Sequence, residues 1–98
     1  MTFKIAISPR AQREIENAID FYKMYSLNAP DYFIASLNDS YTMLAKNPFF
    51  AVRYKNVRAI KVRRFPYALF FTINESENRV RVLSCFHTKQ DPKKRPEF

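Results

Sequence analysis

The sequence predicts a two-layer α+β domain in which an antiparallel sheet packs on a helical hairpin, in the order β-α-α-β-β-β. A short alternating segment opens the chain, and two stretches with apolar residues at helical spacing follow it. Three strand-like segments then close the chain, and their tight connections favour an antiparallel meander. The amphipathic helix pair is expected to cover one face of this sheet.

The first half of the chain contains the predicted first strand and both helices. Residues 3–8 alternate between apolar and other side chains, as in a half-buried strand. Ser8 precedes a proline, which is typical of a helix start, and the first helix is expected over residues 9–25. Asn28 is expected to cap a second helix, which ends before Pro48 because the residue before a proline avoids helical backbone angles.

The second half contains the other three predicted strands. Residues 49–57 are expected to form a loop, and the alternating residues 58–65 a strand. Residues 67–74 are apolar on both faces, as in a central strand, and a polar hairpin loop leads to a last strand over residues 79–87. Residues 88–98 are a basic tail, so the whole chain is expected to be a single domain.

The composition excludes several classes of protein. With 98 residues and no glycine, the chain has no room for two domains and no glycine-rich phosphate loop. One cysteine and one histidine cannot build a structural zinc site or an internal disulfide, and no metal or other cofactor is expected. Asparagine is expected wherever a turn needs a positive φ, with four candidates: Asn47, Asn56, Asn74 and Asn78.

The N-terminal residues lack the apolar stretch of a signal peptide, and the longest apolar run is too short to span a bilayer. A soluble cytoplasmic protein with no membrane partner is therefore expected. Residues 1–50 carry five basic and five acidic side chains, whereas residues 51–98 carry twelve basic and four acidic ones. The whole net charge of +8 thus lies in the second half, which indicates an anionic partner.

The chain offers little for nucleophilic catalysis. Cys85 and His87 lie two residues apart on the predicted last strand, so their side chains are expected to share a face. A nucleophilic cysteine needs exposure and a positive environment, however, and free cysteines are among the most buried residues. Cys85 is therefore expected to be a packing residue.

Four basic or titratable side chains are expected on the sheet surface opposite the helices: Lys61, Arg63, Arg81 and His87. If they converge there, they can bind a phosphodiester, or stabilise the transition state of RNA cleavage with His87 as acid or base. The alternative is that these residues keep an exposed sheet face soluble. Further cations that can contact a target or a phosphate are Arg53, beside Tyr54 in the predicted loop, and Lys93 and Lys94 in the tail.

Two stretches carry a resemblance to a known family. Residues 62–71, V-R-R-F-P-Y-A-L-F-F, are similar to the R-x-F-P-Y-x-I-x-Y pattern at the start of a central strand in the RelE/ParE superfamily of bacterial toxins. Residues 80–92, V-R-V-L-S-C-F-H-T-K-Q-D-P, are similar to its last strand followed by H-x-x-R-D-P, with Gln90 in place of the arginine. The resemblance covers nearly the whole chain and implies the toxin of a type II toxin–antitoxin system.

The resemblance implies two alternative activities. ParE-like members are poisons of DNA gyrase without catalytic residues of their own, and the Pro-Tyr and Asp-Pro matches favour this branch. RelE-like members cleave mRNA on the ribosome, and in that case Lys61, Arg63, Arg81 and His87 are the catalytic candidates. Thr88 stands where the RelE-like tyrosine is expected, which disfavours that branch. A non-toxic basic binding module is the third hypothesis.

The resemblance also implies a partner. A cognate antitoxin is expected to bind through an acidic C-terminal segment, which suits the basic second half of the chain. The residues that bind the antitoxin are not defined by the sequence.

Overall fold

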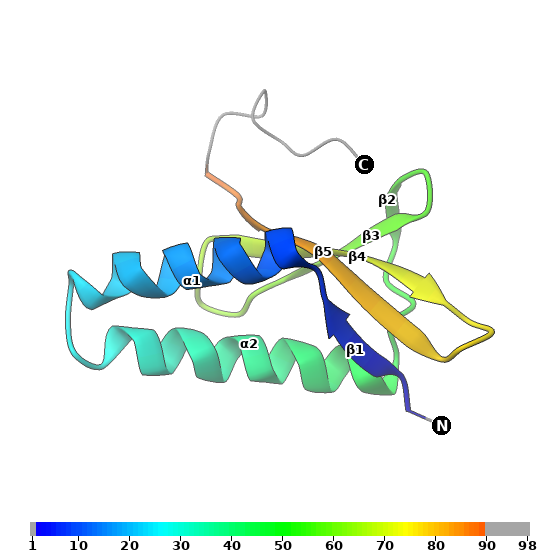
Figure 1. Ribbon diagram of the computed structural model, residues 1–98, viewed down its shortest axis with the longest axis horizontal. Helices are drawn as coiled ribbons and strands as arrows, with labels where there is room; N and C mark the ends of the chain where they lie inside the picture. The colour runs from blue at the N-terminus through cyan, green and yellow to red at the C-terminus, as the bar shows by residue number, and fades with distance from the viewer. Residues whose placement is uncertain (1, 90–98) are drawn as a thin grey trace.

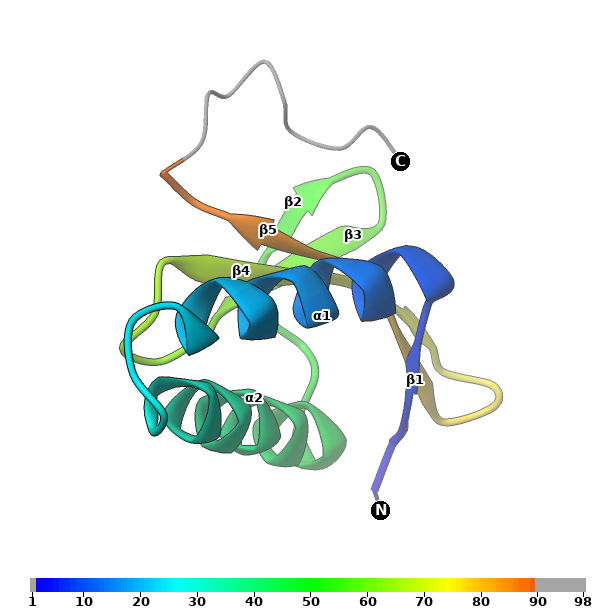
Figure 2. The ribbon, with the colours of Figure 1, turned by 60° about the vertical axis from the view of Figure 1, so that its left-hand side comes forward.

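The computed structural model describes residues 2–89, which fold into a helical layer and a sheet layer (Figure 1). The elements, in chain order, are β1 (Lys4–Ile7), α1 (Pro9–Lys23), α2 (Ala29–Lys46), β2 (Val52–Tyr54), β3 (Val57–Lys61), β4 (Tyr67–Asn74) and β5 (Arg79–His87). Figure 2 shows α1 and α2 side by side on one face of the sheet. The predicted α+β class and the helical hairpin are confirmed.

The sheet has the strand order β1-β5-β4-β3-β2. The meander from β2 to β5 is antiparallel, and its part from β3 to β5 was predicted. The sheet as a whole is mixed, because β1 pairs with β5 in the parallel direction. This corrects the prediction of a purely antiparallel sheet. The helical hairpin after β1 provides the long connection that a parallel strand requires.

The segment predicted as a loop contains the short edge strand β2, which pairs irregularly with β3. The turn between the two strands includes Lys55, whose φ is 52°. β3 ends at Lys61, four residues earlier than predicted, because the chain turns at Arg64, whose φ is 69°. β4 and β5 have the predicted bounds.

The helix starts differ in how they are capped. The Ser8 Oγ accepts a hydrogen bond from the Ala11 amide at 3.1 Å, which confirms Ser8 as the cap of α1. Asn28 occupies the cap position of α2, but its side chain makes no capping bond. The Ser26 Oγ accepts from the Ala29 amide at 3.0 Å instead. Asn28 is therefore the cap residue, as predicted, but Ser26 supplies the side-chain bond.

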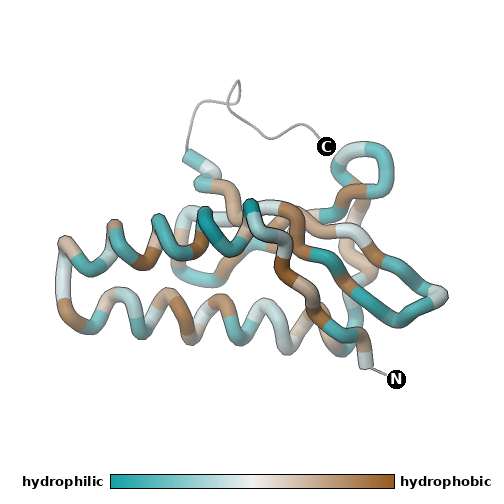
Figure 3. The backbone as a smooth tube through the Cα atoms, in the orientation of Figure 1, coloured by the Kyte–Doolittle hydropathy of each residue, from teal (hydrophilic) through white to brown (hydrophobic). Residues whose placement is uncertain are grey.

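The core lies between the helices and one face of the sheet. It includes Phe33 and Leu44 of α2 and Leu69 and Phe71 of β4, all fully buried. In Figure 3 the β4–β5 turn is coloured mostly as hydrophilic, whereas hydrophobic segments recur along the helices and strands. No helix among residues 2–89 is long and apolar enough to cross a membrane.

Candidate target-binding surface

An extra residue in β5 decides which side chains reach each face of the sheet. Phe71 of β4 pairs with Val82, but Phe70 pairs with Ser84, so Leu83 is the additional residue of a β-bulge. Side chains alternate along a regular strand, and one inserted residue reverses the alternation after it.

The bulge places Arg81 and His87 on opposite faces of the sheet. Arg81 pairs with Thr72, which alternates with the core residue Phe71 and so lies on the face away from the helices. His87 pairs with the core residue Tyr67 and therefore lies on the helix side. The predicted convergence of His87 with the other three candidates is thus wrong, because the sequence pattern assumed an unbroken strand.

The face away from the helices, here called the far face, carries two of the predicted cations. Lys61 of β3 pairs with Ala68, and Arg81 pairs with Thr72. Both cations are exposed, and their rows lie four positions apart along β4, which is roughly 13 Å. They therefore flank a surface and do not form a compact cluster.

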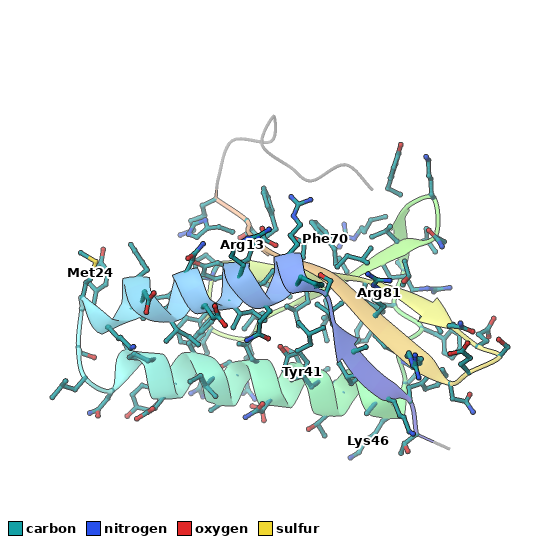
Figure 4. The ribbon with its side chains drawn as sticks, viewed as in Figure 1. Arg13, Met24, Tyr41, Lys46, Phe70 and Arg81 are labelled. Carbon is teal, nitrogen blue, oxygen red and sulfur yellow. The ribbon has the colours of Figure 1, made fainter. Side chains whose placement is uncertain are left out.

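Aromatic residues lie between these two cations. Phe70 and Phe86 stack on the far face with ring centroids 6.1 Å apart and an interplanar angle of 26°. Phe86 is only 7% exposed and Phe70 is half-buried. Figure 4 shows Phe70 and Arg81 among the side chains that the structure describes.

The strand register adds two cations that the sequence analysis did not select. Lys4 of β1 pairs with Arg79 of β5, and both precede Arg81 and its partner Ala6 by two residues, so they share the far face. Arg79 is partly neutralised by Glu77, with 3.6 Å between the Nη1 and Oε2 atoms. The alternation of side chains within each strand indicated the face on which Lys4 and Arg79 lie. The pairing of the two residues, however, depends on the parallel position of β1.

The remaining candidates lie around the sheet. Arg63 is exposed in the β3–β4 turn, where it follows the last residue of β3 by two positions. Arg53 is exposed on the edge strand β2, and Tyr54 beside it is 55% exposed. The Lys55 Nζ lies 5.3 Å from the centroid of the Tyr54 ring. Lys93, Lys94 and most of the predicted tail lie outside the described residues.

His87 packs at the end of β5 against Tyr67, with ring centroids 5.0 Å apart. The His87 Nδ1 accepts a hydrogen bond from the Lys89 amide at 3.2 Å. The imidazole therefore has a structural environment on the helix side, separated by the sheet from Lys61 and Arg81.

Cys85 is a packing residue, as the sequence predicted. Its side chain belongs to the core and is 2% exposed. Burial, with a further contribution from the negative charge of Glu14, raises the pKa of the Cys85 thiol to about 12. A thiol in this state is protonated near neutral pH, so it is not a nucleophile.

Glu14 of α1 bonds to β5, and the sequence analysis did not select it. Its Oε1 accepts hydrogen bonds from the Ser84 Oγ at 2.8 Å and from the Cys85 amide at 3.2 Å. It also lies 3.8 Å from the Nε of Arg10. The sequence did not indicate this contact, because Ser84 and Cys85 are about seventy positions away from Glu14.

A family model identifies the family of this chain. Residues 5–92 match the family model of the ParE toxin of type II toxin–antitoxin systems, parDE. No curated protein sequence matches the chain.

Two solved structures share the fold. One is a chain from the chromosomal ParDE toxin–antitoxin system of P. aeruginosa, with a TM-score of 0.64, 14% identity, and coverage of 89% of this chain and 97% of that chain. The other is a chain from the RelBE2 toxin–antitoxin complex of Mycobacterium tuberculosis, with a TM-score of 0.64, 16% identity, and coverage of 89% and 92%. The fold and the match over residues 5–92 define a RelE/ParE-type toxin domain. Within this class, the chain belongs to the ParE toxin family of type II toxin–antitoxin systems.

Proposed function

We propose that this toxin inhibits DNA gyrase by binding it, and that a cognate antitoxin with an acidic C-terminal segment neutralises the toxin. The match to the ParE family over residues 5–92 is the observation that carries the proposal. The toxin–antitoxin systems of the two structural neighbours support an antitoxin as partner.

The arrangement of the basic residues supports binding over catalysis. Acid–base cleavage of RNA needs a proton-transferring group beside the cations that stabilise the transition state. His87 lies on the helix side, whereas Lys61 and Arg81 lie on the far face. A spread of exposed cations suits contact with a large anionic surface, to which charge complementarity gives rapid and specific association.

In this proposal the far face and its rim contact the target. Lys61 and Arg81 supply the central cations, and Arg63 and Arg53 extend the basic surface along the β3–β4 turn and the edge strand. Lys93 and Lys94 are assigned to the same contact from the sequence, whereas His87 lies on the helix side of the sheet and is left out of it.

A gyrase assay with purified proteins tests the proposal. Relaxed plasmid, gyrase and ATP are incubated with increasing toxin, and supercoiled and cleaved plasmid are measured. We expect supercoiling to fall and cleaved plasmid to accumulate. The double variant Lys61→Ala/Arg81→Ala should need about tenfold more toxin, because two exposed charge contacts contribute about 0.7 kcal/mol each.

Lys46→Ala is the matched control. Lys46 is an exposed cation at the end of α2, on the helical layer of the molecule (Figure 4). It should inhibit gyrase like the unmodified toxin. Normal supercoiling at toxin concentrations that stop bacterial growth would contradict the proposal, and cleavage of ribosome-bound mRNA by the same protein would replace it with the endonuclease alternative.

A further inference from the structure

The stretch of the sequence between Asp39 and Glu75 contains no acidic residue. It includes the whole of β2, β3 and β4, whereas α1 alone carries three acidic side chains. The basic residues of this stretch are Lys46, Arg53, Lys55, Arg58, Lys61, Arg63 and Arg64. An anionic partner that contacts these three strands therefore meets positive charge without any acidic side chain from the strands themselves.

Two of these cations lie at the end of a ribbon that β2 and β3 form, here called the β2–β3 ribbon (residues 52–61). β2 is the edge strand of the sheet and pairs with β3. Residues 51–56 are all exposed, and they include Arg53 on β2 and Lys55 in the turn. In both ribbon views this turn lies away from α2 (Figures 1 and 2). The end of the ribbon is therefore accessible to a large partner.

Contacts at the base of the β2–β3 ribbon hold it in place. The Arg58 Nη1 donates to the Phe50 carbonyl at 2.7 Å, and the Arg58 Cζ lies 5.6 Å from the centroid of the Phe49 ring. β3 also pairs with β4 from Arg58 to Lys61. The backbone that carries the exposed cations is therefore fixed before binding, which lowers the entropic cost of a contact.

The end of the ribbon combines cationic, aromatic and amide side chains. Tyr54 is 55% exposed, and the Lys55 Nζ lies 5.3 Å from the centroid of its ring. Asn56 follows in the turn and is exposed. Arginine, lysine and tyrosine side chains bond to phosphates, and an asparagine amide can bond to the edge of adenine in the major groove. This set of side chains is typical of a contact with nucleic acid.

The dimensions of the ribbon favour duplex DNA over RNA. Neighbouring strands lie about 4.8 Å apart, and the major groove of B-DNA, about 12 Å wide, admits a two-stranded ribbon. The major groove of duplex RNA is too deep and narrow for side chains to read. Single strands are bound by several aromatic rings on which successive bases stack, and the ribbon has one aromatic residue, Tyr54.

We propose that the β2–β3 ribbon enters the major groove of duplex DNA, with Arg53 and Lys55 bound to phosphates. The inference deepens the proposed function and rests on it in one respect, because the DNA is assigned as the segment that gyrase holds. A toxin that contacts both the enzyme and its DNA binds their complex more tightly than either component, since the second contact is intramolecular. Phosphate contacts carry no sequence information, so binding to many sequences is expected.

A double variant at the end of the ribbon tests this contact. The probe is a fluorescein-labelled DNA duplex of about 20 base pairs, and fluorescence anisotropy measures binding at about 150 mM salt. We expect Arg53→Ala/Lys55→Ala to bind about tenfold more weakly than the unmodified toxin, with an unchanged thermal unfolding midpoint. The slope of log K against log salt should also become shallower by about two, because each phosphate contact contributes about one to it.

Arg13→Ala/Lys46→Ala is the matched control, because it also removes one arginine and one lysine. Both residues are exposed and lie on the two helices (Figure 4). We expect this variant to bind the DNA duplex less than about threefold more weakly than the unmodified toxin, since distant charges are screened by salt. Equal weakening in the two double variants would show that only net charge matters, and would overturn the ribbon as the binding site.

An RNA duplex of the same sequence tests the choice of groove. We expect the unmodified toxin to bind it about tenfold more weakly than the DNA duplex, because the ribbon does not fit the RNA major groove. Equal affinity for the two duplexes would overturn the major-groove contact.

The DNA contact and the proposed function fail in different ways. If the unmodified toxin does not bind the DNA duplex but still inhibits gyrase, the DNA contact is wrong and the proposed function stands. If it binds the duplex and leaves supercoiling by gyrase unchanged, the proposed function fails instead. If Arg53→Ala/Lys55→Ala binds DNA normally but no longer binds gyrase in the absence of DNA, the ribbon contacts the protein and the inference is wrong.

Discussion

At the scale of single residues, Cys85 links burial to ionisation. Burial is the larger cause and the nearby Glu14 charge the smaller one, and together they raise the pKa of the thiol from 9.0 to about 12. Burial likewise raises the pKa values of Tyr41 and Tyr67 from 10.0 to about 12. The folded protein therefore disfavours the thiolate and the two phenolates.

This shift predicts a loss of stability at alkaline pH. Below pH 9 the thiol is protonated in both the folded and the unfolded chain, so its contribution to stability is complete. Above pH 9 the unfolded chain releases the proton first, and the free energy of unfolding falls as the pH rises toward 12. Thermal unfolding midpoints should therefore drop between pH 9 and pH 10, before the tyrosines contribute.

Cys85→Ala separates the cysteine from the tyrosines. The variant loses some core packing at every pH, but its unfolding midpoint should change less than that of the unmodified protein between pH 9 and pH 10. Iodoacetamide should also leave the native thiol unmodified at pH 8 and label it after unfolding. Rapid labelling of the folded protein at pH 8 would contradict this account of Cys85.

The residues with positive φ angles were poorly predicted from the sequence. Positive φ angles occur at Lys55, Arg64 and Asn78, and only Asn78 belongs to the asparagines expected there. A chain without glycine must place other residues in left-handed conformations, at a cost of roughly 1 kcal/mol each. Neither Lys55 nor Arg64 has a side chain that favours this conformation, so local preference gave no signal.

At the scale of elements, Glu14 joins α1 to β5. Its carboxylate is the acceptor for the buried Ser84 hydroxyl and for the Cys85 amide. Glu14→Ala removes this acceptor, and the free energy of unfolding should fall by about 2 kcal/mol because two polar groups lose their partner. Glu14→Gln keeps a side-chain oxygen and should lose less than half of that amount.

Urea unfolding measures the difference, with Glu16→Ala as control because Glu16 is an exposed residue of the same helix. A loss in Glu14→Ala no larger than in Glu16→Ala would show that the contact between α1 and β5 does not stabilise the fold.

The bounds of the helices and strands were easier to predict than the face of the sheet on which each side chain lies. Hydrophobic periodicity and turn residues predicted β4, β5 and the start of α1 at the observed residues. The run from Val82 to Phe86 is apolar enough to conceal the bulge at Leu83, and the bulge moved His87 away from Arg81. The parallel position of β1 depends on contacts across the whole chain, so local patterns could not predict it either.

At the scale of the whole molecule, charge and structure are divided in the same way. The helical layer comes from the half of the chain with no net charge, and the strands β2 to β5 come from the half with a net charge of +8. A sheet-rich basic half is the part of the chain to which the proposed function assigns an anionic target. The family match over residues 5–92 places the molecule among the ParE toxins of type II toxin–antitoxin systems.

Pulse labelling after controlled induction tests the central claim most directly. The toxin is expressed in a bacterial host, and the incorporation of thymidine and methionine is followed over the first minutes. If the toxin acts on gyrase, thymidine incorporation falls first, since supercoiling supports replication. If methionine incorporation falls first, the ribosome is the target and the account of a gyrase-binding toxin is wrong.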